Sequence, residues 1–187
     1  MKASISAHPG LAMNPTQAAN EHLKRTFINH WEVELRKQPK MAFYSGVKQE
    51  FGEEQYLNLP KRSHRVNIAK LRSSSHDLRV ELGRYTKKTG SNYKLSKACH
   101  FCSDIDLLEG LAELPFSEEP IIETEEHALT ECPQYHGLRS NLSENLKCLI
   151  LLKEYRAIML SHHLPEFGKF LTDCHRLRSS SRTPSNI

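Results

Sequence analysis

The chain has 187 residues, of which 38% are hydrophobic, and its formal net charge is +4 at pH 7. The mean hydropathy of -0.58 and the absence of a run near the roughly 18 apolar residues of a bilayer span argue against a membrane protein. The first residues hold no apolar stretch long enough for a signal peptide. We therefore expect an intracellular protein, nuclear or cytoplasmic, whose cysteines bind metal rather than pair.

The N-terminal part is predicted to form one long helix after a disordered start over residues 1–15. The helix is expected to begin near Thr16 and to end before Pro39. Apolar residues recur at every fourth position along it, and we expect this stripe, with the single tryptophan Trp31, to face a core. The stripe consists of Ala19, Leu23, Phe27, Trp31 and Leu35.

The region 16–97 is predicted to be helical, and its second half, 61–97, is basic. Eleven Lys and Arg stand against two acidic residues in that segment, a local balance of +9. Tyr85 and Tyr93 are candidate platforms on which a base stacks. The candidate phosphate contacts are Lys61, Arg62, Arg65, Lys70, Arg72, Arg79, Arg84, Lys87 and Lys88. A solvated helix surface, or a block that neutralises the acidic segment after it, would explain the same charges.

Local patterns divide this basic segment into shorter elements. A helix is predicted over 62–71, with Ile68 facing inward. Gly83 is expected to end the next helical turn in a left-handed conformation, and residues 87–96 are expected to form a polar loop. His76 is interpreted as a cap or, preferably, as a buried hydrogen-bonding residue.

Four residues downstream have the types and the spacing of a structural zinc site. They read Cys-x2-Cys, then 24 residues, then His-x4-Cys, and they are Cys99, Cys102, His127 and Cys132. Zinc prefers sulfur and imidazole nitrogen, and its structural sites use four protein ligands. The sequence therefore predicts one zinc ion, with a turn over 97–102 whose backbone amides point at the thiolates. Scattered thiols and imidazoles without a metal are the alternative.

The remaining histidines and cysteines near this site receive other roles. His100 and His136 are competing ligands, but His100 lies inside the turn and is expected to point away. Cys148 and Cys174 are left as free thiols, and Cys148 is expected to be buried because it lies in an apolar helical pattern. Four protein ligands leave a metal no open position, so no enzyme is expected.

The C-terminal half is predicted to be helical around an acidic loop. Residues 103–131 hold ten Asp and Glu and no Lys or Arg. They belong to a zinc-knuckle region over 98–140, which is followed by helices over 141–177 and by a Ser/Arg-rich disordered tail over 178–187. The predicted fold class is therefore mainly α: a small helical domain with an embedded zinc knuckle and disordered termini.

Three segments in order carry a resemblance to a known family. They are LRSSSHDLRVELGRY at Leu71–Tyr85, ACHFC at Ala98–Cys102 and ETEEHALTECPQYHGLR at Glu123–Arg139. With these motifs, residues 61–140 resemble the segment that follows the polymerase in reverse transcriptases of non-LTR (LINE-type) retrotransposons. The chain departs from such enzymes because it has no Asp-Asp pair, no palm-sized region and no endonuclease. The resemblance therefore implies a detached accessory module with a zinc knuckle.

Charge, zinc pattern and resemblance together predict a non-enzymatic, zinc-binding module that binds RNA or DNA, possibly single-stranded. One alternative is a protein-interaction adaptor that uses the acidic loop 103–131 and the C-terminal helices. Another is a translated transposon remnant without a selected function. Binding to single-stranded RNA at increasing salt separates the first hypothesis from the second.

Overall fold

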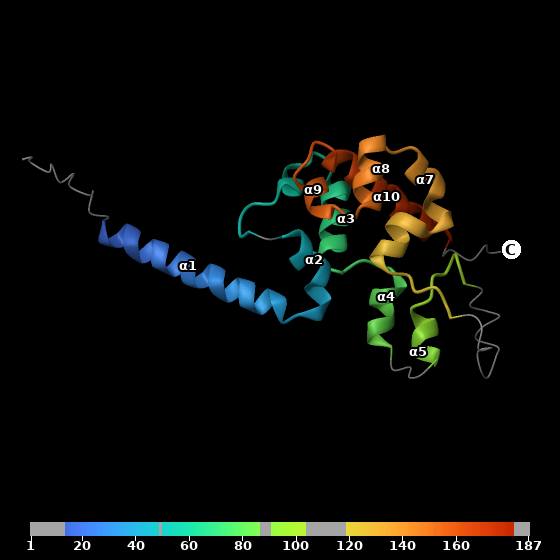
Figure 1. Cartoon of the computed structure of the whole chain (residues 1–187), viewed down its shortest axis with the longest axis horizontal. Coiled ribbons are helices and arrows are strands. Elements are labelled where there is room, and N and C mark those ends of the chain that lie inside the picture. Colours follow the sequence, from blue (N-terminus) through green and yellow to red (C-terminus); the bar gives the residue numbers. More distant parts are fainter. Residues whose placement is uncertain (1–13, 49, 87–90, 104–118, 182–187) are drawn as a thin grey trace, which may run out of the picture. The chain divides into compact units, whose positions relative to one another are not determined.

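A computed structural model describes residues 14–48, 50–86, 91–103 and 119–181. The chain divides into two compact units, residues 1–39 and residues 40–187 (Figure 1). Within the described residues the only β pairing is an isolated bridge between Ala98 and Ile122, and helices make up the rest of the regular structure. The prediction of a mainly α fold is confirmed. The N-terminal disorder predicted over residues 1–15 is wrong for Asn14 and Pro15, which cap and begin a helix, while residues 1–13 lie outside the described residues. Residues 182–187 of the predicted tail lie outside them as well.

In its described residues, the first unit is built on the helix α1 (Pro15–Arg36). Asn14 caps it, because its side-chain oxygen accepts a hydrogen bond from the Thr16 N–H at 3.0 Å, so the cap lies two residues before the predicted one. No residue of α1 is buried. The expectation that the stripe with Trp31 faces a core is therefore wrong, because a single helix has nothing within its own unit against which to bury a whole face.

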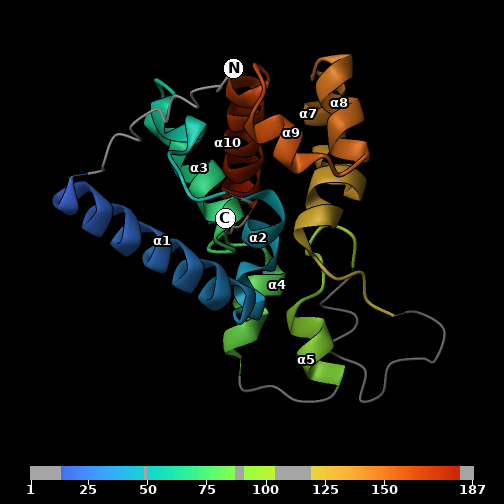
Figure 2. The ribbon, with the colours of Figure 1, turned by 60° about the vertical axis from the view of Figure 1, so that its left-hand side comes forward.

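The second unit is a set of short helices around a longer C-terminal one (Figure 2). In chain order they are η1 (Pro39–Met41), α2 (Ala42–Val47), η2 (Gln55–Asn58), α3 (Arg62–Arg72), α4 (Arg79–Leu82), η3 (Gly83–Tyr85), α5 (Ser91–Ser96), η4 (His127–Glu131), η5 (Pro133–Tyr135), α7 (His136–Ser140), α8 (Glu144–Leu151), α9 (Tyr155–Met159) and α10 (Leu164–Ser181). The helix predicted over 62–71 is confirmed as α3. The polar loop predicted over 87–96 is wrong from Ser91 onward, where α5 forms.

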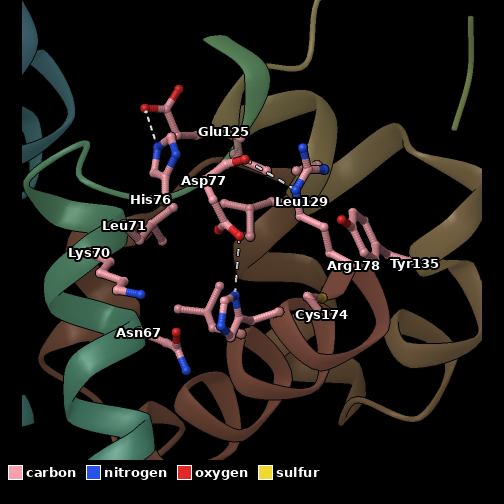
Figure 3. A pocket seen from close by; sticks show the side chains of 14 residues that line it. Asn67, Lys70, Leu71, His76, Asp77, Glu125, Leu129, Tyr135, Cys174 and Arg178 are labelled. Carbon is pink, nitrogen blue, oxygen red and sulfur yellow. Dashed lines mark hydrogen bonds and ion pairs between the residues drawn. The ribbon is translucent and has the colours of Figure 1, made fainter. Parts of the chain in front are cut away.

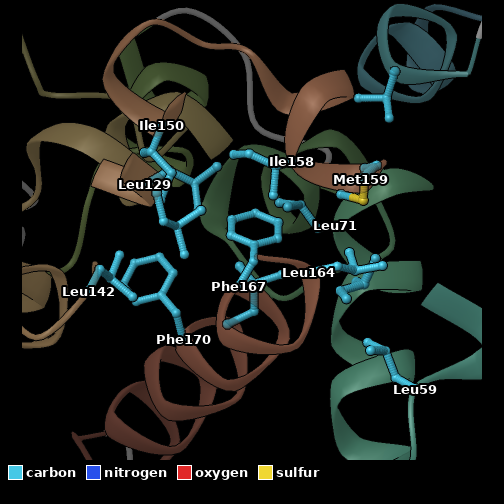
Figure 4. Close-up of a cluster of buried hydrophobic side chains, with 14 residues drawn as sticks. Leu59, Leu71, Leu129, Leu142, Ile150, Ile158, Met159, Leu164, Phe167 and Phe170 are labelled. Atoms are coloured by element: carbon cyan, nitrogen blue, oxygen red, sulfur yellow. The ribbon is translucent and has the colours of Figure 1, made fainter. Parts of the chain in front are cut away.

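The core of the second unit lies between α3 and α10 and extends to α8 and α9 (Figure 4). Ile68 of α3 and Phe167 of α10 are fully buried. Gly168 allows the two helices to approach closely, since a Cβ at this position would lie 2.8 Å from the Cβ of His64. The inward orientation predicted for Ile68 is confirmed.

Two backbone positions differ from the sequence-based expectations. Gly83 has φ -66 and is not left-handed. Its lack of a side chain serves packing instead, because a Cβ there would lie 2.5 Å from the Cγ of Lys97. Lys153 adopts a left-handed conformation, with φ 60, and lies between α8 and α9. The apolar pattern of the sequence continues through this position and gives no sign of the break.

The C-terminal helix extends further than predicted. α10 continues to Ser181, and Arg178 is only 2% exposed. The prediction of a disordered tail from Arg178 is therefore wrong for its first four residues, because a buried carboxylate binds this arginine, as described below. Cys148 is exposed, which corrects the expectation that it is buried. No helix in the described part of the chain has both the length and the apolar character that a membrane crossing requires.

Candidate metal centre

The two halves of the predicted zinc site are joined by a short backbone ladder. Ala98 and Ile122 form an antiparallel bridge, the Cys99 N–H donates to the Ile121 carbonyl at 2.7 Å, and the Glu123 N–H donates to the Lys97 carbonyl at 2.9 Å. This ladder places the Cys-x2-Cys turn beside η4, although their ligands are far apart in the sequence. Backbone hydrogen bonds between residues 97–99 and 121–123 therefore bring together two ligand pairs that 24 residues separate in the sequence.

The four predicted ligands come together. One ligand atom from each of Cys99, Cys102, His127 and Cys132 lies within 4.8 Å of the other three. The Cys132 sulfur lies 3.9 Å from the Cys99 sulfur and 3.7 Å from the Cys102 sulfur, and the Cys102 sulfur lies 3.4 Å from Nε2 of His127. A tetrahedral ion with metal–sulfur bonds of about 2.3 Å requires edges of roughly 3.8 Å. The cluster therefore fits such an ion, and the sulfurs are too far apart for disulfide bonds.

The local backbone around His127 explains how one short element supplies two ligands. Residues 127–131 form a π-helical turn, in which the Cys132 N–H donates to the His127 carbonyl at 2.8 Å. This wide turn returns the chain after five residues, so that His127 and Cys132 face the same point. Nδ1 of His127 lies 3.4 Å from a carboxylate oxygen of Glu131. That contact favours the tautomer with its proton on Nδ1 and leaves Nε2 free to bind a metal.

The thiols depend on one another for their protonation. A hydrogen bond with Cys132 and burial raise the pKa of the Cys99 thiol, while the same hydrogen bond lowers the pKa of Cys132. Burial and the hydrogen bond with Cys99 raise the pKa of Cys102 to about 11. Without a cation the site therefore does not favour three thiolates together. The Phe101 N–H donates to the Cys99 sulfur, as predicted for an amide of the turn.

A buried ion pair lies beside the sulfur cluster. The guanidinium of Arg178 donates to both carboxylate oxygens of Glu123, and the Arg79 N–H donates to the same carboxylate at 2.8 Å. Arg178 also hydrogen bonds with the Tyr135 hydroxyl, and burial raises the pKa of that phenol. Figure 3 shows Arg178 and Tyr135 side by side near Cys174. These contacts connect the end of α10 to the chain that enters η4.

A cavity of about 70 Å³ lies next to this ion pair, lined in part by His76, Glu125 and Cys174 (Figure 3). Nε2 of His76 lies 2.9 Å from a carboxylate oxygen of Glu125, and the His76 side chain is 9% exposed. The interpretation of His76 as a buried hydrogen-bonding residue is confirmed. Burial raises the pKa of the Cys174 thiol to about 12, so that this free cysteine remains protonated at neutral pH.

The competing histidines do not join the cluster. His100 is exposed, and its ring stacks edgewise on Phe101 with centroids 5.4 Å apart. His136 is also exposed, at the start of α7. Neither is among the residues whose ligand atoms converge. Within the described residues, the donor set is therefore three sulfurs and one imidazole nitrogen.

The predicted phosphate contacts are dispersed, and several are already bonded within the protein. Lys61 and Arg62 are exposed at the start of α3, and Arg84 is exposed but pairs with Glu81 at 3.0 Å. Arg65, Lys70 and Arg79 are half-buried, and the guanidiniums of Arg65 and Arg79 donate to backbone carbonyls. Lys87 and Lys88 lie outside the described residues.

The predicted phosphate contact that the structure contradicts most clearly is Arg72. Its side chain is 2% exposed, and its guanidinium donates to both carboxylate oxygens of Glu54. The rings of Tyr44 and Tyr56 lie 4.8 Å and 5.2 Å from it. Arg72 is therefore a structural residue and is not available to a phosphate. The local sequence gave no sign of this, because Glu54 lies 18 residues earlier.

Sequence reasoning missed two residues that contact candidate site residues. Glu131 lies in the acidic segment of the sequence, and its carboxylate contacts Nδ1 of His127 at 3.4 Å. Lys40 lies outside the basic block, yet its Nζ lies 3.3 Å from the hydroxyl of Tyr85, whose side chain is 73% exposed. The signal for Glu131 is its position four residues after a candidate metal ligand, His127. The contact of Lys40 with Tyr85 depends on tertiary structure and has no local signal.

Comparisons with family models, with curated proteins and with solved structures find no significant match to this chain. The functional conclusion therefore depends on the site itself. That site is a buried cluster of three cysteines and one histidine, close enough together to hold a metal ion.

Proposed function

We propose that the protein is a zinc-stabilised, nucleic-acid-binding module without catalytic activity. The observation that carries the proposal is the convergence of four ligand atoms from Cys99, Cys102, His127 and Cys132. Sulfur and imidazole donors favour zinc, whereas magnesium and calcium prefer oxygen. Four protein ligands fill a tetrahedral coordination shell, which supports a structural role and not a hydrolytic one.

Zinc at this centre would fasten η4 to the Cys-x2-Cys turn. Structural zinc contributes apparent binding energies of roughly 10 kcal/mol or more to small sites, and this energy stabilises the fold. The α3–α10 core lies outside the cluster and has its own buried residues. We therefore expect metal removal to loosen the knuckle and to leave part of the helical core intact.

The nucleic-acid part of the proposal is supported by a surface where exposed tyrosines lie beside lysines. Tyr85 follows α4, with Nζ of Lys40 5.9 Å from the centroid of its ring. Tyr93 lies on α5, with Nζ of Lys97 3.9 Å from its ring centroid. α4 and α5 contact each other and lie side by side in both views (Figures 1 and 2). Aromatic faces with adjacent cations are typical of proteins that stack and neutralise single-stranded nucleic acid.

The resemblance of three ordered segments to the C-terminal part of non-LTR retrotransposon reverse transcriptases supports the same proposal. The resemblance also suggests where the protein came from: a retrotransposon of this kind that has lost its polymerase and endonuclease. The resemblance includes all four cluster residues and the stretch that ends at Tyr85. It therefore links the zinc centre and the tyrosine surface in one inherited module.

A titration of single-stranded RNA at three salt concentrations tests the proposal. Tyr85→Leu retains an apolar side chain and removes the ring, so that affinity should fall roughly 5- to 150-fold, as expected for the loss of one stacked base. Lys61→Gln with Arg62→Gln should flatten the log–log salt slope by about 1.4 if both contact phosphate. Lys169→Gln with Arg176→Gln is the matched control, because it removes the same charge from exposed positions of α10.

Unchanged affinity in Tyr85→Leu, together with equal salt slopes in all proteins, would refute nucleic-acid binding by this surface. The adaptor hypothesis would then take its place. A specific observation favours it as the second candidate: Leu151, Leu152 and Leu160 are each more than half exposed. Exposed apolar side chains grouped near the ends of α8 and α9 are typical of a protein-binding surface.

A further inference from the structure

A groove of about 320 Å³ lies among η4, α7 and α8, apart from the tyrosine surface. Its floor contains the buried side chains of Leu129, Leu142 and Ile150. The size falls at the lower end of the range of small-molecule sites, and an apolar floor with a few polar groups is their usual composition.

The rim of this groove is cationic. Arg139, Lys147 and His136 line it together with the hydroxyls of Thr130 and Ser140. No carboxylate is among the described residues that line the groove. Among the described residues, Lys147 pairs with Glu144 alone, at 2.8 Å, and the Glu144 side chain is 88% exposed, so this pair is weak and can be exchanged for another anion.

Arg139 gives independent support for an anionic ligand. It is half-buried, and its guanidinium donates to two backbone carbonyls, those of Ala128 at 3.4 Å and Cys132 at 2.6 Å. No carboxylate of the described residues pairs with it. A guanidinium has five N–H donors, so that donors remain for a ligand. A half-buried cation without a carboxylate partner is stabilised when an anion binds beside it.

We propose that this groove binds an aliphatic carboxylate, with its chain on the floor of Leu129, Leu142 and Ile150 and its carboxylate at Arg139 and Lys147. The apolar floor and the cationic rim each recognise one half of such a molecule. Neutral aliphatic molecules would leave the rim without a counter-charge, and cationic ones would be repelled by it. This inference is independent of nucleic-acid binding, because it involves neither Tyr85 nor α5.

Calorimetric titration of the full-length, zinc-loaded protein with three ten-carbon probes tests the charge requirement. Decanoate should bind saturably at one molecule per chain, and decyltrimethylammonium at least tenfold more weakly, with decan-1-ol between them. No saturable decanoate binding below about 1 mM, or equal binding of the anionic and the cationic probe, would overturn the proposal.

Two pairs of variants locate the ligand. Ser140→Trp places a large side chain in the groove from an exposed position and should abolish decanoate binding, whereas Ser179→Trp on the exposed face of α10 should not. Lys147→Gln should weaken binding roughly tenfold, whereas Lys153→Gln, an exposed lysine outside the lining, should leave it unchanged. Decanoate affinity that is equal in Lys147→Gln and Lys153→Gln would place the ligand elsewhere and refute the site, even if Ser140→Trp fails to fold.

Discussion

Arg178, near the end of α10, binds the carboxylate of Glu123 through both terminal nitrogens, with Nη2 at 2.7 Å from Oε2. The side chains of the two residues are 3% and 1% exposed, and 55 residues separate them in the sequence. Glu123 begins the stretch that leads to His127. The pair therefore ties the C-terminal helix to the part of the fold that carries the candidate metal ligands.

The first prediction concerns this buried pair. Glu123→Gln should destabilise the protein by about 3–5 kcal/mol, because it leaves the Arg178 guanidinium buried without its counter-charge. Asp173→Asn is the control, since Asp173 pairs with exposed Lys169 and Arg176, and it should cost about 0–1 kcal/mol. Urea unfolding followed by circular dichroism measures both. Equal midpoints for the two variants would contradict a structural role for the pair.

The second prediction concerns the metal. Native mass spectrometry should find one zinc ion per chain, and Cys99→Ser combined with Cys132→Ser should abolish its binding, because two of the four ligands are lost. Cys148→Ser changes an exposed thiol outside the cluster and should retain full zinc. A double variant that kept one zinc ion would show that the ligands have been wrongly assigned.

The third prediction tests the close approach of α3 and α10. Gly168→Ala should destabilise the protein by about 1–3 kcal/mol, since the new Cβ would lie 2.8 Å from the Cβ of His64, which cannot move without its helix. Gly46→Ala in α2 meets nothing within 4 Å and should be neutral or stabilise by up to about 1 kcal/mol. The melting temperature should therefore fall in Gly168→Ala and stay the same or rise in Gly46→Ala.

The fourth prediction concerns acid stability. Burial raises the pKa of Glu54, but hydrogen bonds from Arg72 and Lys48 outweigh it and hold the pKa below its ordinary value. A lowered folded-state pKa stabilises the protein above the unfolded value of about 4.3, and this contribution disappears as the pH falls through the folded-state pKa. The difference in unfolding free energy between wild type and Glu54→Gln should therefore shrink between pH 7 and pH 3.

Glu53→Gln serves as the control for acid stability, because the Glu53 carboxylate accepts an exposed hydrogen bond from the Asn58 amide at 3.2 Å and, among the described residues, forms no ion pair. Its unfolding free energy should follow that of the wild type at every pH. A constant difference between wild type and Glu54→Gln across this range would show that the Glu54 carboxylate does not gain stability from Arg72 and Lys48.

The sequence was sufficient to predict the ligand cluster and the helical class. Cys99 and Cys102 are three positions apart, and His127 and Cys132 are five positions apart, so that each pair lies within one local turn and the chemistry of the residues identifies it. The π-helical form of η4 was not predictable, because a hydrogen bond over five residues has no distinct sequence pattern. α3 was predicted correctly because its apolar residues follow the helical period.

The arginines show why the rest of the prediction failed. Arg72 and Arg178 occur in polar sequence, where arginine usually lies at the surface. Both are buried because a carboxylate far away in the chain, Glu54 or Glu123, reaches them in the folded state. Such partners are set by tertiary structure, and a local charge count cannot reveal them.

The backbone ladder between Lys97 and Glu123 has a consequence for protein engineering. Its hydrogen bonds hold both ends of the segment between the ligand pairs at fixed positions, whatever lies between them. Because the entropy of closing a flexible loop grows only with the logarithm of its length, a flexible insert that doubled the number of residues between these two ends should cost about 0.6 kcal/mol. Insertion of a tag or a reporter domain between the two ligand pairs should therefore leave the ladder assembled, and with it the Cys-x2-Cys turn beside η4.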